Sequence, residues 1–156
     1  MRRISYFIIL GSIILDQISK YFVKTSMHLG ERITILDNLL YITSHRNKGA
    51  AWGMLQNKML FFYAVTVVAL IIFIYLLQTT PLLNKFTILG LGLMIGGTIG
   101  NFIDRLFYKE VVDFIDVYIG SYDFPIFNIA DSALVIGIGL VLLDAFFDYK
   151  KEKFNG

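Results

Sequence analysis

Four long apolar stretches dominate the chain, and polar segments separate them. They cover approximately residues 4–23, 59–78, 86–108 and 128–147. At a rise of about 1.5 Å per residue, about 20 residues suffice to cross the ~30 Å hydrocarbon core of a bilayer. The pattern therefore predicts an all-α integral membrane protein with four transmembrane helices, folded as a single membrane domain over residues 1–156.

The first apolar stretch begins directly after Arg2 and Arg3, which resembles the start of a secretory signal peptide. No small-residue cleavage motif follows it, and the stretch continues through Asp16 and Lys20. We therefore expect it to be retained as a membrane anchor rather than removed.

The segment at 25–58 is too polar to cross a membrane, and it contains two short runs of β-branched and apolar residues. These runs, at 32–36 and 39–44, are separated by Asp37 and Asn38, which form a typical turn pair. The pattern predicts a small β-hairpin.

The segment at 109–127 contains VVDFIDVYI and YDFPIF. Both are typical of short strands, and we expect them to extend the same sheet. Between the hairpin and the second helix, the sequence RNKGAAWGM has small residues that suit close packing. Its aromatic residue, Trp52, is of a type common at membrane interfaces.

An even number of spans places both termini on one side of the membrane, and the basic residues predict which side. Lysine and arginine are enriched in cytoplasmic segments beside membrane spans. Here they lie at the termini and in the short second connection, as Arg2, Arg3, Lys85, Lys150, Lys151 and Lys153. The long first connection is also basic, but long connections translocate with less regard to charge. We therefore expect cytoplasmic termini, with 25–58 and 109–127 on the outer face.

This topology brings polar side chains from several elements to the outer leaflet. Asp16 would lie about 18 Å along the first helix, and Asp104 about 27 Å along the third. The fourth helix would start at the outer surface. The converging set is Asp16, Asn101, Asp104, Arg105, Asp113, Asn128 and Asp131. Carboxylates are costly near lipid and are usually retained there for function, so this set is the candidate site.

Helical spacing assigns these residues to faces. One stripe of the third helix, with i, i+4, i+7 and i+8 spacing, comprises Gly97, Asn101, Asp104 and Arg105. A set of small-xxx-small repeats comprises Gly92, Gly96 and Gly100. Such repeats allow a neighbouring helix to approach closely. Asn128 and Asp131 share a face, and Asn128 is a candidate N-cap of the fourth helix.

Several charged residues have structural explanations that compete with functional ones. Asp16 and Lys20 form an i, i+4 pair, which indicates a structural contact as readily as a role in shaping the site. Asp104 and Arg105 are expected to be structural, as interfacial charges. The acids expected to be solvated are Asp116, Asp123, Asp144 and Asp148. We therefore expect Asp116→Asn and Asp148→Asn to have mild effects.

The composition of the chain favours a membrane domain and excludes several kinds of functional site. The chain is 56% hydrophobic and 17% charged, and its mean hydropathy of +0.67 suits a membrane domain. It has no cysteine, which excludes disulfides, thiolate nucleophiles and thiolate metal sites. A formal net charge of +2 gives no sign of nucleic-acid binding. His28 and His45 have no partner at metal-ligand spacing, so we expect no metal site.

Asp113 and Asp131 are the candidate catalytic pair, because each stands alone among apolar residues. Two carboxylates within hydrogen-bond reach share a proton near neutral pH. The ionised partner can take a proton from water while the protonated partner donates to a carbonyl oxygen, as in aspartic proteases. This hypothesis assumes that the two side chains are close in space.

Two other classes remain open from the residues alone. An ion-coupled transporter would carry protons or sodium on its carboxylates, but no internal repeat is visible and the acids lie at one surface rather than at the midplane. A metal-dependent lipid phosphotransferase would hold Mg²⁺ on Asp104, Asp113 and Asp116 and would lose activity with a chelator.

Five short motifs resemble those of one family, the lipoprotein signal peptidases, also called signal peptidase II. They are DQISK at 16–20, NKGAAWG at 47–53, GNFIDR at 100–105, VVDF at 111–114 and FNIADS at 127–132. Each motif alone is weak, but five in the family's order on four spans are specific. Trp52 stands where the family more often has phenylalanine, and since both are aromatic the expected activity is little affected.

The resemblance implies a bacterial intramembrane aspartic endopeptidase, which cleaves the signal peptide from prolipoproteins just before a diacylglyceryl-modified cysteine. It implies that Asp113 and Asp131 are catalytic. The residues that it implies bind substrate or support the site are Asp16, Asn47, Asn101, Arg105 and Asn128. It further implies an outer β-cradle, a small outer helix and no cofactor. We expect a monomer in contact with lipid, located in the bacterial cytoplasmic membrane with its active site toward the outer leaflet.

Overall fold

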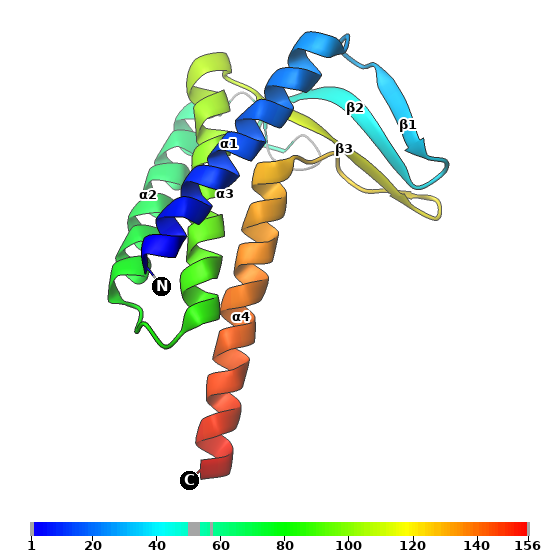
Figure 1. Cartoon of the computed structure of the whole chain (residues 1–156). Helices are drawn as coiled ribbons and strands as arrows, with labels where there is room; N and C mark the ends of the chain where they lie inside the picture. Colours follow the sequence, from blue (N-terminus) through cyan, green and yellow to red (C-terminus); the bar gives the residue numbers. More distant parts are fainter. Residues whose placement is uncertain (1, 50–53, 57, 156) are drawn as a thin grey trace.

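A computed structural model describes residues 2–49, 54–56 and 58–155, and this part of the chain contains four long helices. The helices are α1 (Arg2–Ser26), α2 (Met59–Thr79), α3 (Lys85–Tyr108) and α4 (Ile129–Asn155). Each is long and apolar enough to cross a membrane, and a small antiparallel sheet joins them at one end (Figure 1). The predicted fold class is therefore confirmed.

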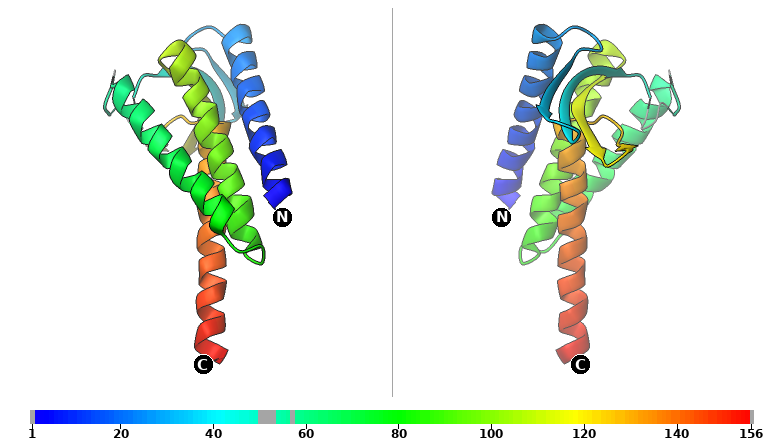
Figure 2. Two further views of the ribbon diagram at one scale, coloured as in Figure 1. Left: turned by 90° about the vertical axis from the view of Figure 1, so that its left-hand side faces the viewer. Right: turned by 90° about the vertical axis from the view of Figure 1, so that its right-hand side faces the viewer.

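Helix α3 lies at the centre of the bundle and packs against the other three helices (Figure 2). An apolar core formed by Leu77, Ile88, Leu91 and Ile95 joins α2 to α3. Helix α2 is apolar around its whole circumference, yet Thr66 and Leu77 are its only buried residues. In a bilayer such a surface faces lipid, which explains why the sequence shows no polar face on this helix.

Glycines bring α3 very close to α1. The three that the sequence predicts as a packing surface, Gly92, Gly96 and Gly100, all lie against α1. A Cβ atom built at Gly96 would lie 2.7 Å from the Cβ atom of Ser12, and one built at Gly100 would lie 2.6 Å from Oδ2 of Asp16. No side chain fits at that spacing, so these positions require glycine as long as the helices keep this distance.

A second glycine face brings α3 equally close to α4. Cβ atoms built at Gly90 and Gly97 would collide with the backbone carbonyls of Gly137 and Ala130, respectively. The central helix therefore contacts both neighbours almost backbone to backbone. This close packing places the polar face of α1, the end of α3 and the start of α4 within reach of one another.

The four strands form one sheet in the order β1-β2-β3-β4. They are β1 (Arg32–Leu36), β2 (Leu40–Asn47), β3 (Val111–Ile119) and β4 (Tyr122–Asp123). The predicted hairpin and its extension by the 109–127 segment are both confirmed, since all neighbouring strands pair antiparallel. The hairpin turn contains Asn38 with a φ of 57°, a left-handed conformation that asparagine tolerates better than most residues.

The sheet is fixed to the bundle through a second apolar cluster. Val23 near the end of α1 packs with Val112 and Phe114 of β3, and Met27 and Ile129 lie against them. Figure 1 shows that the sheet projects sideways from this end of the bundle, away from both chain termini. Trp52 lies outside the described residues, and the expected small outer helix, whose bounds the sequence does not define, stays a prediction.

The expectation that Asp144 and Asp148 are solvated is wrong. Asp144 is 8% exposed and accepts a hydrogen bond of 3.0 Å from the backbone N–H of Thr87. Asp148 accepts one of 2.7 Å from Nδ2 of Asn84, the N-cap residue of α3. The first N–H groups of a helix lack partners within the helix; Asp144 satisfies that of Thr87, whereas Asp148 binds the side chain of the N-cap residue. Only the tertiary structure shows this pairing.

Helix α4 is longer than the predicted span, which ended at 147. It continues to Asn155, because the lysines and the glutamate at 150–153 favour a helix and no proline or glycine comes before its end. Figure 1 shows this end of α4 projecting beyond the other helices. Helix α2 ends at Thr79, where the Thr-Thr-Pro sequence predicts it.

We predict that Gly96→Ala destabilises the bundle, whereas Gly139→Ala does not. The added methyl group at Gly96 would collide with Ser12, but nothing lies within 4 Å of a Cβ atom at Gly139. Overpacking of this kind typically costs about 1–3 kcal/mol, and the control gains helix propensity. Thermal unfolding in detergent should show a lower Tm for Gly96→Ala alone. Equal Tm values for the two variants would contradict the close α1–α3 packing.

Candidate active site

The start of α4 is held by side chains from two elements. Oδ1 of Asn128 accepts a hydrogen bond of 3.0 Å from the N–H of Asp131, and Oδ2 of Asp131 accepts one of 3.2 Å from the N–H of Asn128. This reciprocal arrangement is a capping box, so the predicted N-cap role of Asn128 is confirmed. From α1, Oδ1 of Asp16 accepts a bond of 2.9 Å from the N–H of Ala130.

Asp113 lies near the start of β3 and is 2% exposed. It belongs to β3 and pairs in register with His45 of β2. Its Oδ2 accepts a hydrogen bond of 3.0 Å from Nδ2 of Asn47, and its Oδ1 accepts one of 2.7 Å from Nδ2 of Asn128. The two asparagines therefore hold both oxygens of this carboxylate in fixed directions.

Asp131 is held in a similar way by α3. Its Oδ1 accepts a hydrogen bond of 2.7 Å from Nδ2 of Asn101. The orientation of that amide is set by its other end, because Oδ1 of Asn101 accepts bonds of 2.9 Å from Lys20 and 3.1 Å from Asn128. Asn101 and Asn128 thus link the two carboxylates through a continuous series of hydrogen bonds.

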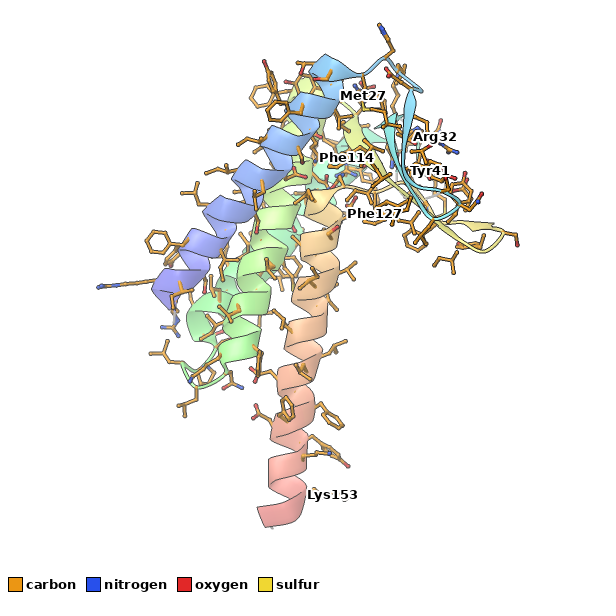
Figure 3. All side chains as sticks on the ribbon, turned by 45° about the vertical axis from the view of Figure 1, so that its right-hand side comes forward. Met27, Arg32, Tyr41, Phe114, Phe127 and Lys153 are labelled. Carbon is orange, nitrogen blue, oxygen red and sulfur yellow. The ribbon has the colours of Figure 1, made fainter. Side chains whose placement is uncertain are left out.

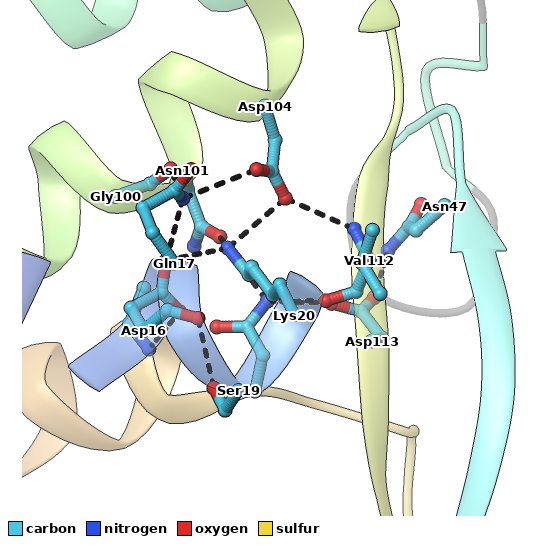
Figure 4. A network of polar contacts seen from close by, with 12 residues as sticks. Asp16, Gln17, Ser19, Lys20, Asn47, Gly100, Asn101, Asp104, Val112 and Asp113 are labelled. Carbon is cyan, nitrogen blue, oxygen red and sulfur yellow. Dashed lines mark hydrogen bonds and ion pairs between the residues drawn. The ribbon is translucent and has the colours of Figure 1, made fainter. Parts of the chain in front are cut away.

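A buried lysine on α1 connects this series to two further carboxylates (Figure 4). Lys20 is 3% exposed, and its Nζ lies 2.8 Å from Asp16 and 3.1 Å from Asp104. Oδ2 of Asp104 also accepts a hydrogen bond of 3.1 Å from the N–H of Val112, the residue before Asp113. The i, i+4 contact between Asp16 and Lys20 is therefore present, and it also positions the site.

Gln17 is a further member of this network and is absent from the predicted site residues. Its Nε2 donates to Asp16, Asp104 and the carbonyl of Gly100 at 3.1–3.2 Å. A polar amide beside an acid in an apolar helix was a usable signal. What could not be read from the sequence is that this amide bridges carboxylates from two helices.

Burial and a neighbouring charge raise the pKa of Asp113 to about 7. Loss of solvation is the larger cause, because it disfavours the charged form, and the negative charge of Asp131 adds to it. Hydrogen bonds from Asn47 and Asn128, together with the charge of Lys20, act in the opposite direction. This electrostatic coupling, and the pocket that both side chains line, place the two carboxylates close to one another.

Both carboxylates line a cavity of about 620 Å³ between the sheet and the helix ends. Its polar wall comprises Asn47, Asn101, Arg105, Asp113, Asp131 and Ser132, and its apolar wall comprises Val111, Phe124, Pro125, Ile126, Phe127, Val135 and Ile136. The side chains of Val135 and Ile136 are mostly exposed, so this wall continues onto the lipid-facing surface of α4. The cavity thus combines two carboxylates with room for an apolar chain.

Arg105 contributes a positive charge to this cavity. Its guanidinium lies 4.8 Å above the ring of Phe62 and faces the charges of Asp131 and Asp113. It forms no ion pair with any carboxylate in the part of the chain that the structure describes. The sequence-based expectation of an interfacial structural charge is therefore incomplete, because this cation is available to a ligand.

The remaining acids do not join the cavity. Asp104 is engaged with Lys20, and Asp116 is buried in the sheet, where it pairs with Arg32. The expectation that Asp116 is a solvated loop acid is therefore wrong, whereas Asp123 is exposed as expected. Across the described residues, no three acidic or histidine side chains come together to hold a metal ion.

The fold and the cavity define a multi-pass membrane protein with the groups of an acid–base hydrolase. Comparison with known proteins specifies the family. A family model described as signal peptidase (SPase) II matches residues 8–147. Two solved structures described as bacterial membrane enzymes are 44% and 46% identical to this chain, with TM-scores of 0.89 and 0.82. They cover 94% and 89% of this chain, and this chain covers 90% of each of them.

The chain belongs to the signal peptidase II family. It is accordingly an aspartic endopeptidase, a hydrolase of the cell membrane that acts on lipoprotein precursors. The resemblance seen in the five sequence motifs is thereby confirmed.

We predict that Lys20→Met strongly destabilises the fold, whereas Lys24→Met has a small effect. Removing the buried cation leaves Asp16 and Asp104 unpaired, and an unpaired buried charge typically costs about 3–5 kcal/mol. Lys24 lies one turn further along the same helix and is exposed over the ring of Tyr108. Thermal unfolding in detergent measures both effects. A Tm for Lys20→Met that matches the control would show that the network does not stabilise the helix contacts.

Proposed function

We propose that Asp113 and Asp131 form the catalytic dyad of this peptidase. The scissile bond would be the one before the diacylglyceryl-modified cysteine of a prolipoprotein. The observation that carries the proposal is the shared cavity, whose wall holds two carboxylates from different elements. Burial, and then the charge of Asp131, raises the pKa of Asp113 there. A pair of this kind shares one proton near neutral pH.

The surroundings of the two carboxylates support different roles. With a pKa of about 7, Asp113 retains its proton in a large fraction of molecules at neutral pH. Asp131 lies in the first turn of α4, where a helix favours negative charge. We therefore assign Asp113 as the general acid and Asp131 as the general base.

The proposed reaction balances on these two groups. Asp131 takes a proton from a water molecule as its oxygen attacks the scissile carbonyl carbon, and Asp113 donates its proton to the carbonyl oxygen. The tetrahedral intermediate then loses the amine when the protonated Asp131 donates to the leaving nitrogen. Asp113 recovers its proton from the hydroxyl group as the new carboxyl forms. Each carboxyl thus returns to its starting state.

The other polar residues support this chemistry from their contacts. Asn47, Asn101 and Asn128 donate to the carboxylates and hold them in place. Of the two roles that the family resemblance implies for these amides, substrate binding and support of the site, their contacts favour support. Arg105, which has no carboxylate partner among the described residues, is the group suited to bind a substrate carbonyl beside the scissile bond. Asp16 acts through Lys20 and the start of α4.

A lipid on the substrate suits the apolar wall of the cavity. A signal peptide is a membrane helix that must unwind before cleavage, and exposed peptide groups are costly near lipid. A diacylglyceryl group along the apolar wall would offset this cost, at about 0.8 kcal/mol for each buried CH₂. We propose that lipid anchoring places the scissile carbonyl between Asp113 and Asp131 and that the enzyme acts as a monomer.

The same proposal includes an orientation in the bacterial cytoplasmic membrane. The cavity lies at the sheet end of the bundle, and both termini lie at the other end (Figure 1). Basic residues cluster at the termini and are typical of the cytoplasmic side. We therefore place both termini in the cytoplasm and the dyad toward the outer leaflet.

We predict that Asp113→Asn and Asp131→Asn each abolish cleavage of a lipidated prolipoprotein by the purified enzyme. Asparagine keeps the shape but cannot exchange a proton, and loss of one acid–base group typically costs about 100- to 10,000-fold in kcat. Asp123→Asn makes the same change at an exposed acid of β4 and should leave cleavage unchanged. Parallel reactions with EDTA test the metal-dependent alternative. Near-normal turnover by either dyad variant would refute the assignment.

We predict that kcat/KM decreases as the pH rises through about 7. Because the pKa of Asp113 is raised to about 7, the required proton is present below that pH and is lost above it. A single required proton gives about a tenfold decrease in rate for each pH unit above the pKa. Initial rates at low substrate concentration, across the neutral range, measure this profile. A rate that stays constant or increases on the alkaline side would contradict the role of Asp113 as acid.

A further inference from the structure

Three side chains from three neighbouring strands form an ionic contact away from the cavity, in which the acid is buried and the arginine is partly exposed. Nη2 of Arg32 in β1 lies 2.7 Å from Oδ2 of Asp116 in β3. The hydroxyl of Thr43 in β2 donates to the same oxygen at 2.5 Å and accepts a bond of 3.2 Å from Nε of Arg32. We call this arrangement the Arg32–Thr43–Asp116 clamp. It joins β1, β2 and β3 through side chains, in addition to the backbone pairing of the strands.

Aromatic rings cover the clamp on its outer side. The Arg32 guanidinium lies 4.9 Å from the ring centre of Tyr41 and 5.4 Å from that of Tyr118, and it donates to the hydroxyl of Tyr118 at 3.2 Å. Figure 3 shows Arg32 and Tyr41 together on the sheet. The rings and the Tyr118 hydroxyl hold the guanidinium over Asp116, although the Arg32 side chain itself is 43% exposed.

The buried acid depends on this partner. Asp116 is fully buried, and its Oδ1 has no hydrogen-bond partner among the described residues. A buried carboxylate with one unpaired oxygen is costly unless its charge is matched. A strand does not need a buried carboxylate in order to pair with its neighbours. The presence of Asp116 in the sheet therefore requires another explanation.

The clamp lies at an irregularity of the sheet that also positions Asp113. Ile42 pairs with Ile115, but the next pair is His45 with Asp113, so β2 has one residue more than β3 in this interval. This extra residue is a β-bulge, which bends a strand and changes the direction of its side chains. Thr43 lies within the bulge. Beyond it, Asn47 reaches across to hydrogen-bond Asp113.

We propose that Arg32, Thr43 and Asp116 are positioning residues for the reaction. By fixing the bulge between β2 and β3, the clamp holds Asn47 at hydrogen-bond distance from Asp113 and so sets the position of that carboxylate in the cavity. The clamp touches neither substrate nor the reacting atoms. This inference rests on the proposed role of Asp113 in catalysis.

The charges that face Asp113 come from the other elements of the site. They are Asp131 on α4, Lys20 on α1 and Arg105 on α3, and the strand partner His45 is exposed. Because the clamp is not one of these groups, it acts on Asp113 through geometry. The hydrogen bond from Asn47 favours the ionised form of Asp113. Loosening the clamp weakens this bond, so Asp113 keeps its proton to higher pH.

The test compares Thr43→Val and Asp116→Asn with Asp123→Asn, using cleavage of a lipidated prolipoprotein across pH. The first variant removes only the hydroxyl group and is expected to fold. The second removes the buried charge, and the third makes the same change at an exposed acid. For both clamp variants we expect kcat to fall about 10- to 100-fold, as for a misplacement on the order of 1 Å. We also expect KM to change little and the alkaline limb of the kcat/KM profile to move to higher pH. The control should match the unmodified enzyme.

Each other outcome overturns the inference. Thr43→Val with a normal kcat and pH profile would make the clamp merely structural, even if its Tm decreased. An alkaline limb that moves to lower pH in Asp116→Asn alone would indicate a direct effect of the lost charge. The proposed dyad is tested separately, because it fails only if Asp113→Asn or Asp131→Asn retains activity.

Discussion

The structure depends on one constraint, which is that a charge buried in a membrane bundle must be matched. Lys20 satisfies it by contacting Asp16 and Asp104 while also donating to Asn101. Those partners belong to α1 and α3, and Asp104 in turn binds the backbone of β3 at Val112. A single ammonium group therefore connects two helices and the strand that holds Asp113, the proposed catalytic acid. Because a partially satisfied network is worse than an apolar core, the members of this network depend strongly on one another.

Close helix packing makes this network possible. A lysine side chain can reach two carboxylates only if the helices almost touch, and the glycines of α3 allow that distance. At Gly100 the space that a side chain would occupy is taken by Asp16 itself. The same carboxylate then satisfies an N–H group at the start of α4. The glycine packing and the polar site therefore depend on each other. The small residues bring the helices close enough for the charges to pair, and the paired charges hold the helices at that distance.

Much of this arrangement could be predicted from local sequence. Periodicity and hydropathy predicted the four helices, the turn pair predicted the hairpin, and the capping role of Asn128 followed from its place before an apolar run. The errors concern acids whose partners are distant in sequence. Asp116 pairs with Arg32, and Asp144 binds Thr87 at the start of another helix. A strand acid near a turn and an acid near a helix end resemble solvated residues, and only the tertiary contacts reveal that they are buried.

The two proposed catalytic carboxylates are held by different kinds of structure. Asp131 is fixed by the capping box of α4 and therefore moves with that helix, whereas Asp113 is fixed by strand pairing and by amides from two elements. The distance between the two carboxylates therefore depends on how the sheet packs against the helix ends. Asn128 spans that junction, since it caps α4 and also donates to Asp113. Asn128 is therefore the contact that couples the position of the proposed base on α4 to that of the proposed acid on β3.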